Sequence, residues 1–140
     1  MLFEYEKLTG NTLKSIEYLF EAKNSVAEAQ NEYLETLILT AIAQTCRTYG
    51  MATMASKYLA KASGKAASIS EETEKNIATS KLVQEQVKEE ILQNKQNAIQ
   101  RINEIQPYLE KIKKDYPSIY ADGLNTIGEV YFSADSVSQA

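Results

Sequence analysis

The chain has 140 residues with only five glycines and two prolines, and 44% of the residues are hydrophobic. This length suits one domain that buries a core without disulfide staples, and the abundance of Ala, Glu, Lys, Gln, Leu and Ile favours helix nearly throughout. The net charge is −4 without any histidine, and lysines and glutamates are intermixed, which argues against direct nucleic-acid binding by this segment. The composition therefore predicts an all-α domain.

No targeting signal or disulfide framework is visible in the sequence. Glu4 and Glu6 interrupt any apolar core of a secretory signal. The most apolar window, residues 37–43, is far shorter than the roughly 20 residues of a membrane span. The single Cys46 lies on an apolar stripe, which is typical of a buried structural thiol in a reducing compartment. We therefore expect a cytoplasmic protein without membrane contact.

The N-terminal part of the chain predicts a short apolar piece over residues 2–8 and then a helix that starts near Asn11 and Thr12. One face of that helix is apolar and carries Leu13, Ile16, Leu19, Phe20, Ala22 and Val26. The helix is expected to end near Gln30, and a new one begins over 31–36.

Residues 39–62 have the pattern of two helices packed as an antiparallel hairpin. The predicted apolar stripes are Leu39, Ile42, Ala43 and Cys46 in the first helix, and Ala52, Ala55, Tyr58, Leu59 and Ala62 in the second. Gly50 separates the two stripes and permits a left-handed turn. The alanines allow the two backbones to approach closely.

Two more predicted helices follow. The capping-box spacing of Ser68 and Glu71 predicts a helix start there, and a polar break is expected at residues 93–95. The buried face of the next helix is predicted to hold Ala98, Ile102, Ile105, Leu109 and Ile112. Pro107 lies within this helix and is expected to kink it, because its ring removes a backbone hydrogen bond.

A regular spacing links these hairpins. The stretch GNTLKSIEYLFEA is similar position by position to GMATMASKYLAKA, which aligns Ser15 with Ala55. Ala98 and Ala140 continue the series, so the intervals are 40, 43 and 42 residues. The predicted repeat units are 1–30, 31–68, 70–115 and 117–140.

The chain resembles a run of long-format tetratricopeptide repeats. The basic unit has about 34 residues, and the longer intervals here correspond to roughly two extra helical turns in each unit. Residues 39–62 and the segment LNTIGEVY at 124–131 carry its pattern of large, small and aromatic residues. The resemblance implies a right-handed superhelix of stacked antiparallel helix hairpins, an α-solenoid with about three repeats and a terminal helix. Similar repeats precede helix-turn-helix or AraC-type output domains in regulators of Bacteroidetes, so we expect a fragment of a longer regulator.

The resemblance implies a protein- or peptide-binding module, with a groove lined by the first helix of each unit. By repeat position, its polar residues are Thr40, Gln44, Arg47, Asn125 and Glu129. Arg47 is interpreted either as a ligand for a partner's carboxylate or as a solvated cation near a helix end. Exposed faces of the terminal repeats also offer a surface for self-association.

An enzyme has little support in the sequence. The chain lacks histidine, a glycine-rich phosphate loop and paired cysteines, so we expect no catalysis, cofactor or metal. The pairs Glu71-Glu72 and Glu89-Glu90 are interpreted as exposed charge rather than metal ligands. The tyrosines are interpreted mainly as repeat core; those concerned are Tyr18, Tyr33, Tyr49, Tyr58, Tyr108, Tyr116, Tyr120 and Tyr131.

The alternative function is that of a structural helical-bundle or coiled-coil subunit of a larger assembly. Apolar or small residues recur at helical spacing through 12–49, and a second rod would cover 71–114. This alternative predicts a straight helix through residues 24–36, whereas the repeat interpretation predicts a turn there.

Overall fold

The structure, a computed structural model, describes the backbone of residues 10–139 and the side chains of residues 14–133 apart from Leu92. Within this range the chain is helical and contains no strand, which confirms the all-α prediction. The predicted apolar piece at residues 2–8 and the repeat position at Ala140 lie outside the described residues.

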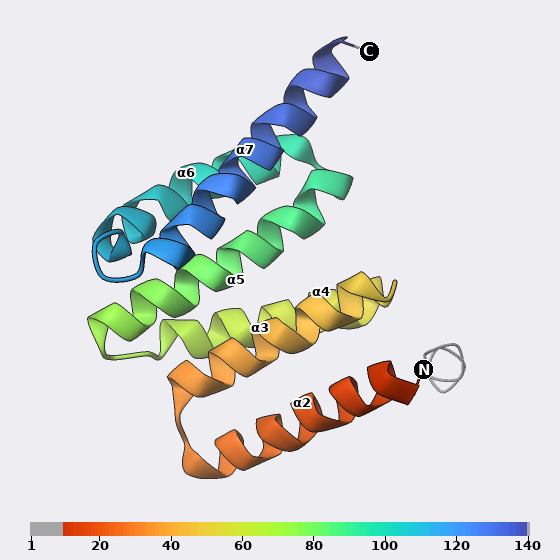
Figure 1. The fold of residues 1–140 in the computed structure, drawn as a ribbon, viewed down its shortest axis with the longest axis vertical. Helices are drawn as coiled ribbons and strands as arrows, with labels where there is room; N and C mark the ends of the chain where they lie inside the picture. The colour runs from red at the N-terminus through yellow and green to blue at the C-terminus, as the bar shows by residue number, and fades with distance from the viewer. Residues whose placement is uncertain (1–9, 140) are drawn as a thin grey trace.

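Six helices follow one another along the long axis of the molecule, with α2 at one end and α7 at the other (Figure 1). Their bounds are α2 Gly10–Ala29, α3 Glu32–Thr48, α4 Ala52–Ala67, α5 Glu72–Gln93, α6 Lys95–Ile112 and α7 Pro117–Gln139. Each helix packs against the next in the chain, and α5 also packs directly against both α3 and α7. The odd-numbered helices therefore form one continuous row.

The chain turns between α2 and α3, where the sequence left two interpretations open. Gln30 adopts a φ of 55°, a left-handed conformation that ends α2. The side chain of Asn31 then accepts a hydrogen bond from the backbone N–H of Leu34 at 3.0 Å and caps α3. The straight helix through residues 24–36, which the coiled-coil alternative requires, is therefore wrong.

The other turns agree with the sequence except at one cap. Gly50 has a φ of 78°, as the predicted left-handed turn requires, and Asn94 caps α6 at the predicted polar break. The capping box between Ser68 and Glu71 is wrong: Ser68 ends α4, and Glu71 is itself the N-cap of α5. Its carboxylate accepts two backbone N–H bonds of the first turn, where a negative charge is also favoured by the helix dipole.

Two hydrophobic clusters form the core. The N-terminal cluster is rich in small residues and consists of Leu39, Ile42, Ala43, Cys46, Met51, Ala55, Tyr58, Leu59, Ala62, Ala66, Ile69, Ala78 and Leu82. The C-terminal cluster is rich in branched residues and consists of Ile77, Val83, Val87, Ala98, Ile102, Ile105, Leu109, Ile112 and Val130. Tyr33 packs against both clusters. The predicted stripes of the α3–α4 hairpin are buried except at Ala52, which is exposed as the first residue of α4. On the apolar face predicted for α2, Ile16 is buried and the other described residues are half-buried, namely Leu19, Phe20, Ala22 and Val26. The side chain of Leu13 lies outside those that the structure describes.

The assignment of the tyrosines mainly to the core is wrong. Of the eight, only Tyr58 is buried, while Tyr18, Tyr49, Tyr116 and Tyr131 are exposed. Tyr58 itself packs edge-to-face against Phe20 of α2, with ring centroids 5.8 Å apart. Tyrosine also tolerates the surface, because its hydroxyl remains hydrated there.

Helix α7 is held closely against α6 and is bare on another face. A Cβ at Gly123 would lie 2.5 Å from a methyl group of Leu109, so glycine allows this approach. Leu124 and Tyr131, on this face, are 47% and 48% exposed. Among the helices between residues 10 and 139, none combines the length and apolar character that crossing a membrane requires.

Candidate functional site: a groove across three helices

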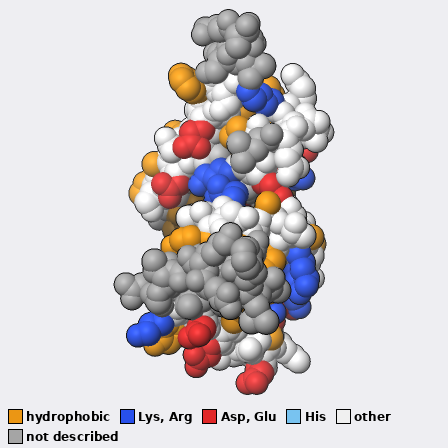
Figure 2. Space-filling model, turned by 90° about the vertical axis from the view of Figure 1, so that its right-hand side faces the viewer, with side chains coloured by type: hydrophobic (Ala, Val, Ile, Leu, Met, Phe, Trp, Pro, Cys, Tyr) orange, Lys and Arg blue, Asp and Glu red, His pale blue; other side chains and the backbone are white. Residues whose placement is uncertain are grey.

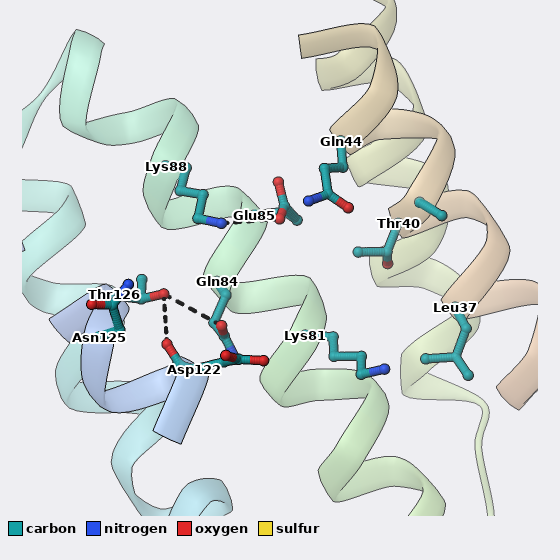
Figure 3. A pocket seen from close by; sticks show the side chains of 11 residues that line it. Leu37, Thr40, Gln44, Lys81, Gln84, Glu85, Lys88, Asp122, Asn125 and Thr126 are labelled. Atoms are coloured by element: carbon teal, nitrogen blue, oxygen red, sulfur yellow. Dashed lines mark hydrogen bonds and ion pairs between the residues drawn. The ribbon is translucent and has the colours of Figure 1, made fainter. Parts of the chain in front are cut away.

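Two adjoining cavities run across the row of odd-numbered helices. The central cavity has a volume of about 410 Å³ and is lined by α3, α5 and α7 (Figure 3). The end cavity has a volume of about 500 Å³ and is lined by the same three helices closer to the C-terminal ends of α3 and α5. Lys88 lines both. We refer to the two cavities together as the groove.

All five residues that the repeat pattern assigns to a groove line these cavities. Thr40, Gln44 and Asn125 line the central cavity, and Arg47 and Glu129 line the end cavity. They come from α3 and α7, which lie far apart in the sequence. Their common placement agrees with the repeat register, while their role in binding a partner stays a prediction.

Helix α5 also lines the groove, with residues that the repeat pattern did not assign to it. This helix supplies Lys81, Gln84, Glu85 and Lys88, the middle row of the central cavity. Glu85 and Gln86 stand where the repeat pattern expects leucine and a small residue. The pattern therefore did not assign groove positions to this helix. The helical spacing of these four polar residues was an available signal, because it places them on one face.

Glu85 ties α3 to α5 in the floor of the groove. Its side chain is 7% exposed and forms an ion pair with the guanidinium of Arg47. Lys88 Nζ lies 3.5 Å from the other carboxylate oxygen. Arg47 is thus paired within the chain, whereas the sequence analysis had considered only a partner's carboxylate or solvent for it.

A second polar link ties α5 to α7. The hydroxyl of Thr126 lies 3.3 Å from Gln84 Oε1 and 3.1 Å from the carbonyl oxygen of Asp122, so its single proton is shared between two acceptors (Figure 3). On the surface of α7, Asn125 Nδ2 donates to Glu129 Oε1 at 3.3 Å. The contacts of Glu85 with Arg47 and of Gln84 with Thr126 thus link the three helices along the groove.

Other polar groups in the central cavity remain open. The side-chain amide of Gln44 has no hydrogen bond, and the ammonium of Lys81 has no ion pair, to any residue that the structure describes. Both side chains are exposed. They are free to meet an incoming donor, acceptor or anion.

The groove carries charges of both signs in equal number. Its positive residues are Arg47, Lys81 and Lys88, and its negative residues are Glu85, Asp122 and Glu129. The side of the molecule where α3 and α5 end likewise mixes acidic, basic and small hydrophobic patches (Figure 2). The ionisable side chains of the groove therefore sum to no net charge.

The acidic pairs considered as metal ligands have other partners or uses. Glu71 caps α5, Glu89 accepts a hydrogen bond from Ser56, and Glu90 pairs with Arg101 at 2.7 Å. In the part of the chain that the structure describes, no group of three or more Asp, Glu or Cys side chains is placed to hold a metal ion.

Comparison with known proteins adds no relative to this picture. No model of a known protein family matches the chain, and neither the curated proteins nor the solved structures yield a significant match.

Proposed function

We propose that this chain is a protein- or peptide-binding module of the tetratricopeptide type, a solenoid of helix hairpins without catalysis of its own. The observation that carries the proposal is that three successive odd-numbered helices, and no other described element, line one polar groove. Stacked hairpins whose first helices form a row are the arrangement by which such repeats bind extended partners.

The groove suits an extended peptide chain. A peptide backbone presents donors and acceptors along its length, and the amides of Gln44 and Asn125 supply both kinds of group from opposite sides of the central cavity. Lys81 adds a donor for a carbonyl or a carboxylate. Ile91 and the 75% exposed Phe132 line the end cavity and offer contact area for an apolar side chain.

A role as the sensory or regulatory part of a bacterial regulator, in the cytoplasm, is proposed on the repeat resemblance and the composition. In such an arrangement, the groove would bind a partner or another domain of the same protein, and an attached output domain would act on transcription. This part of the proposal rests on the sequence alone.

Selection of peptides tests the proposal. Peptides from a displayed random library are selected on the folded chain, and their affinity is measured by isothermal titration calorimetry. A triple variant of exposed groove residues, Gln44→Ala, Lys81→Ala and Asn125→Ala, is expected to lower affinity on the order of 100-fold, from three hydrogen-bonding groups at about 1 kcal/mol each.

A matched triple variant controls for residue type. Lys57, Gln100 and Asn103 are exposed on α4 and α6 and line neither cavity. Their replacement by alanine is expected to leave peptide affinity unchanged. Selected peptides that bind the groove variant as tightly as the parent, or a library that yields no binder, would contradict the proposal.

A further inference from the structure

A third cavity lies between α2, α3 and α4 and shares no residue with the groove. Its volume is about 360 Å³, within the range of about 300–1,000 Å³ that is usual for small-molecule sites. Ala27, Leu39 and Gly64 contribute one apolar wall position from each of the three helices. The cavity therefore combines apolar wall positions with ionisable side chains, in a part of the molecule that the groove does not use.

Two lysines at this cavity are held by an aromatic ring rather than by carboxylates. The Nζ atoms of Lys23 and Lys61 lie 5.6 and 5.2 Å from the ring centroid of Tyr58. Neither forms an ion pair with a carboxylate among the described residues. Two ammonium groups held against one ring repel each other, and an anion beside them would relieve that repulsion.

The third lysine of the cavity is neutralised inside the chain. Lys65 Nζ lies 2.9 Å from Glu35 Oε2 in an ion pair that lacks hydrogen-bond geometry. The Glu35 side chain is only 10% exposed, and its carboxylate forms its ion pair with Lys65. The four ionisable groups of the cavity thus leave two positive charges, those of Lys23 and Lys61, without compensation.

We propose that this cavity binds a small organic anion with an apolar tail, whose acidic head group meets Lys23 and Lys61 and whose tail enters toward Leu39. The site is separate from the peptide groove and gives the chain a second ligand. A small molecule bound between α2, α3 and α4 would contact the same helix, α3, that lines one side of the groove.

Three probes separate the contributions of head and tail. The ¹⁵N-labelled chain is titrated with octanoate, with acetate as the head group alone and with 1-octanol as the tail alone. Octanoate is expected to produce saturable shifts of the Ala27, Gly64 and Ser68 amides at lower concentration than either half. Equal potency of octanol, or shifts confined to other helices, would overturn the proposal.

Removing a positive charge and removing a negative charge from the cavity are expected to change octanoate affinity in opposite directions. A purely structural role of these residues does not predict this. Lys61→Gln is expected to weaken octanoate binding up to about fivefold, the effect of one exposed ion pair, and adding Lys23→Gln weakens it further. Glu35→Gln is expected to tighten binding, because it releases the charge of Lys65.

The control is Lys57→Gln, an exposed lysine of α4 outside the cavity, which is expected to leave octanoate affinity unchanged. Because Lys61 is exposed, its variant keeps the fold, and circular dichroism verifies this for every variant. Equal effects of Lys57→Gln and Lys61→Gln would contradict the site. Failure of these tests leaves the peptide groove unaffected, since the two sites share no residue.

Discussion

The two core clusters pack similar helix hairpins in different ways. Alanines at Ala55 and Ala62 bring α3 and α4 together, whereas Ile102 and Ile105 fill the space in the C-terminal cluster around α6. Close backbone approach depends on small volume, and the filling of a wider space depends on branched side chains. We therefore expect the N-terminal cluster to be sensitive to larger side chains and the C-terminal cluster to be sensitive to smaller ones.

The largest expected effect comes from truncation in the C-terminal cluster. Ile102 is 0% exposed, so Ile102→Ala leaves a cavity and is expected to lower the free energy of unfolding by about 2–5 kcal/mol. Urea unfolding followed by far-UV circular dichroism measures the change. Gln100→Ala, at an exposed position of α6, serves as the control and is expected to change stability by less than about 0.5 kcal/mol. Equal effects of the two variants would contradict the packing described.

Enlargement is expected to damage the N-terminal cluster. Ala62 is 0% exposed between close helices, so Ala62→Leu overpacks the interface and is expected to cost about 1–3 kcal/mol. Ala60 is exposed on the same helix, and Ala60→Leu is expected to be nearly neutral. Unfolding curves that rank the two variants in the reverse order would show that α4 presents a different face to the core.

The ion pair in the groove joins the two regions, because α3 belongs mainly to one cluster and α5 to both. A double-mutant cycle of Arg47→Gln and Glu85→Gln is expected to give a coupling energy of about 1–2 kcal/mol, since Glu85 is buried and Arg47 partly exposed. The exposed pair Lys111 and Glu72, at 3.9 Å, should give almost none. A similar coupling in both cycles would contradict the geometry of the groove.

The smallest expected effect lies at Tyr33, the residue that packs against both clusters. Burial, with a further contribution from Glu74, raises the pKa of the Tyr33 hydroxyl above its ordinary value of 10.0. Above that pH the unfolded chain loses this proton before the folded chain does, so stability falls as the pH rises. Tyr33→Phe removes this dependence.

Unfolding free energies of the parent chain and of Tyr33→Phe test this sign. The difference between the two free energies, parent minus variant, is expected to stay constant below pH 10.0 and to decrease at higher pH. A difference that moves in favour of the parent would contradict the burial of the hydroxyl.

The features predicted correctly from the sequence are those set by local chemistry and helical period. The turn at Gly50, the break at Asn94 and the buried face of α6 depend on nearby residues. The sequence pattern predicted Ser68 as the N-cap. Glu71 takes this role instead, because its carboxylate accepts hydrogen bonds from the backbone N–H groups of Thr73 and Glu74.

The groove surface of α5 depended on contacts across the chain. The buried Glu85 pairs with Arg47, 38 residues away, and the buried Gln84 accepts a hydrogen bond from Thr126 of α7. Neither partner is implied by the local pattern around residues 84–85. The residues that the repeat pattern named lie on α3 and α7, and it named none on α5 between them.

The groove exists only if the first helices of consecutive hairpins lie side by side and run in the same direction. Spin labels at cysteines replacing Glu32 and Glu72, the exposed first residues of α3 and α5, test this directly in a Cys46→Ala background. We predict a label separation of about 10–20 Å, from neighbouring helices whose axes lie about 10 Å apart. Long antiparallel rods would separate the labels by about 25 Å or more, at ~1.5 Å rise per residue, and that result would contradict the groove and the function proposed for it.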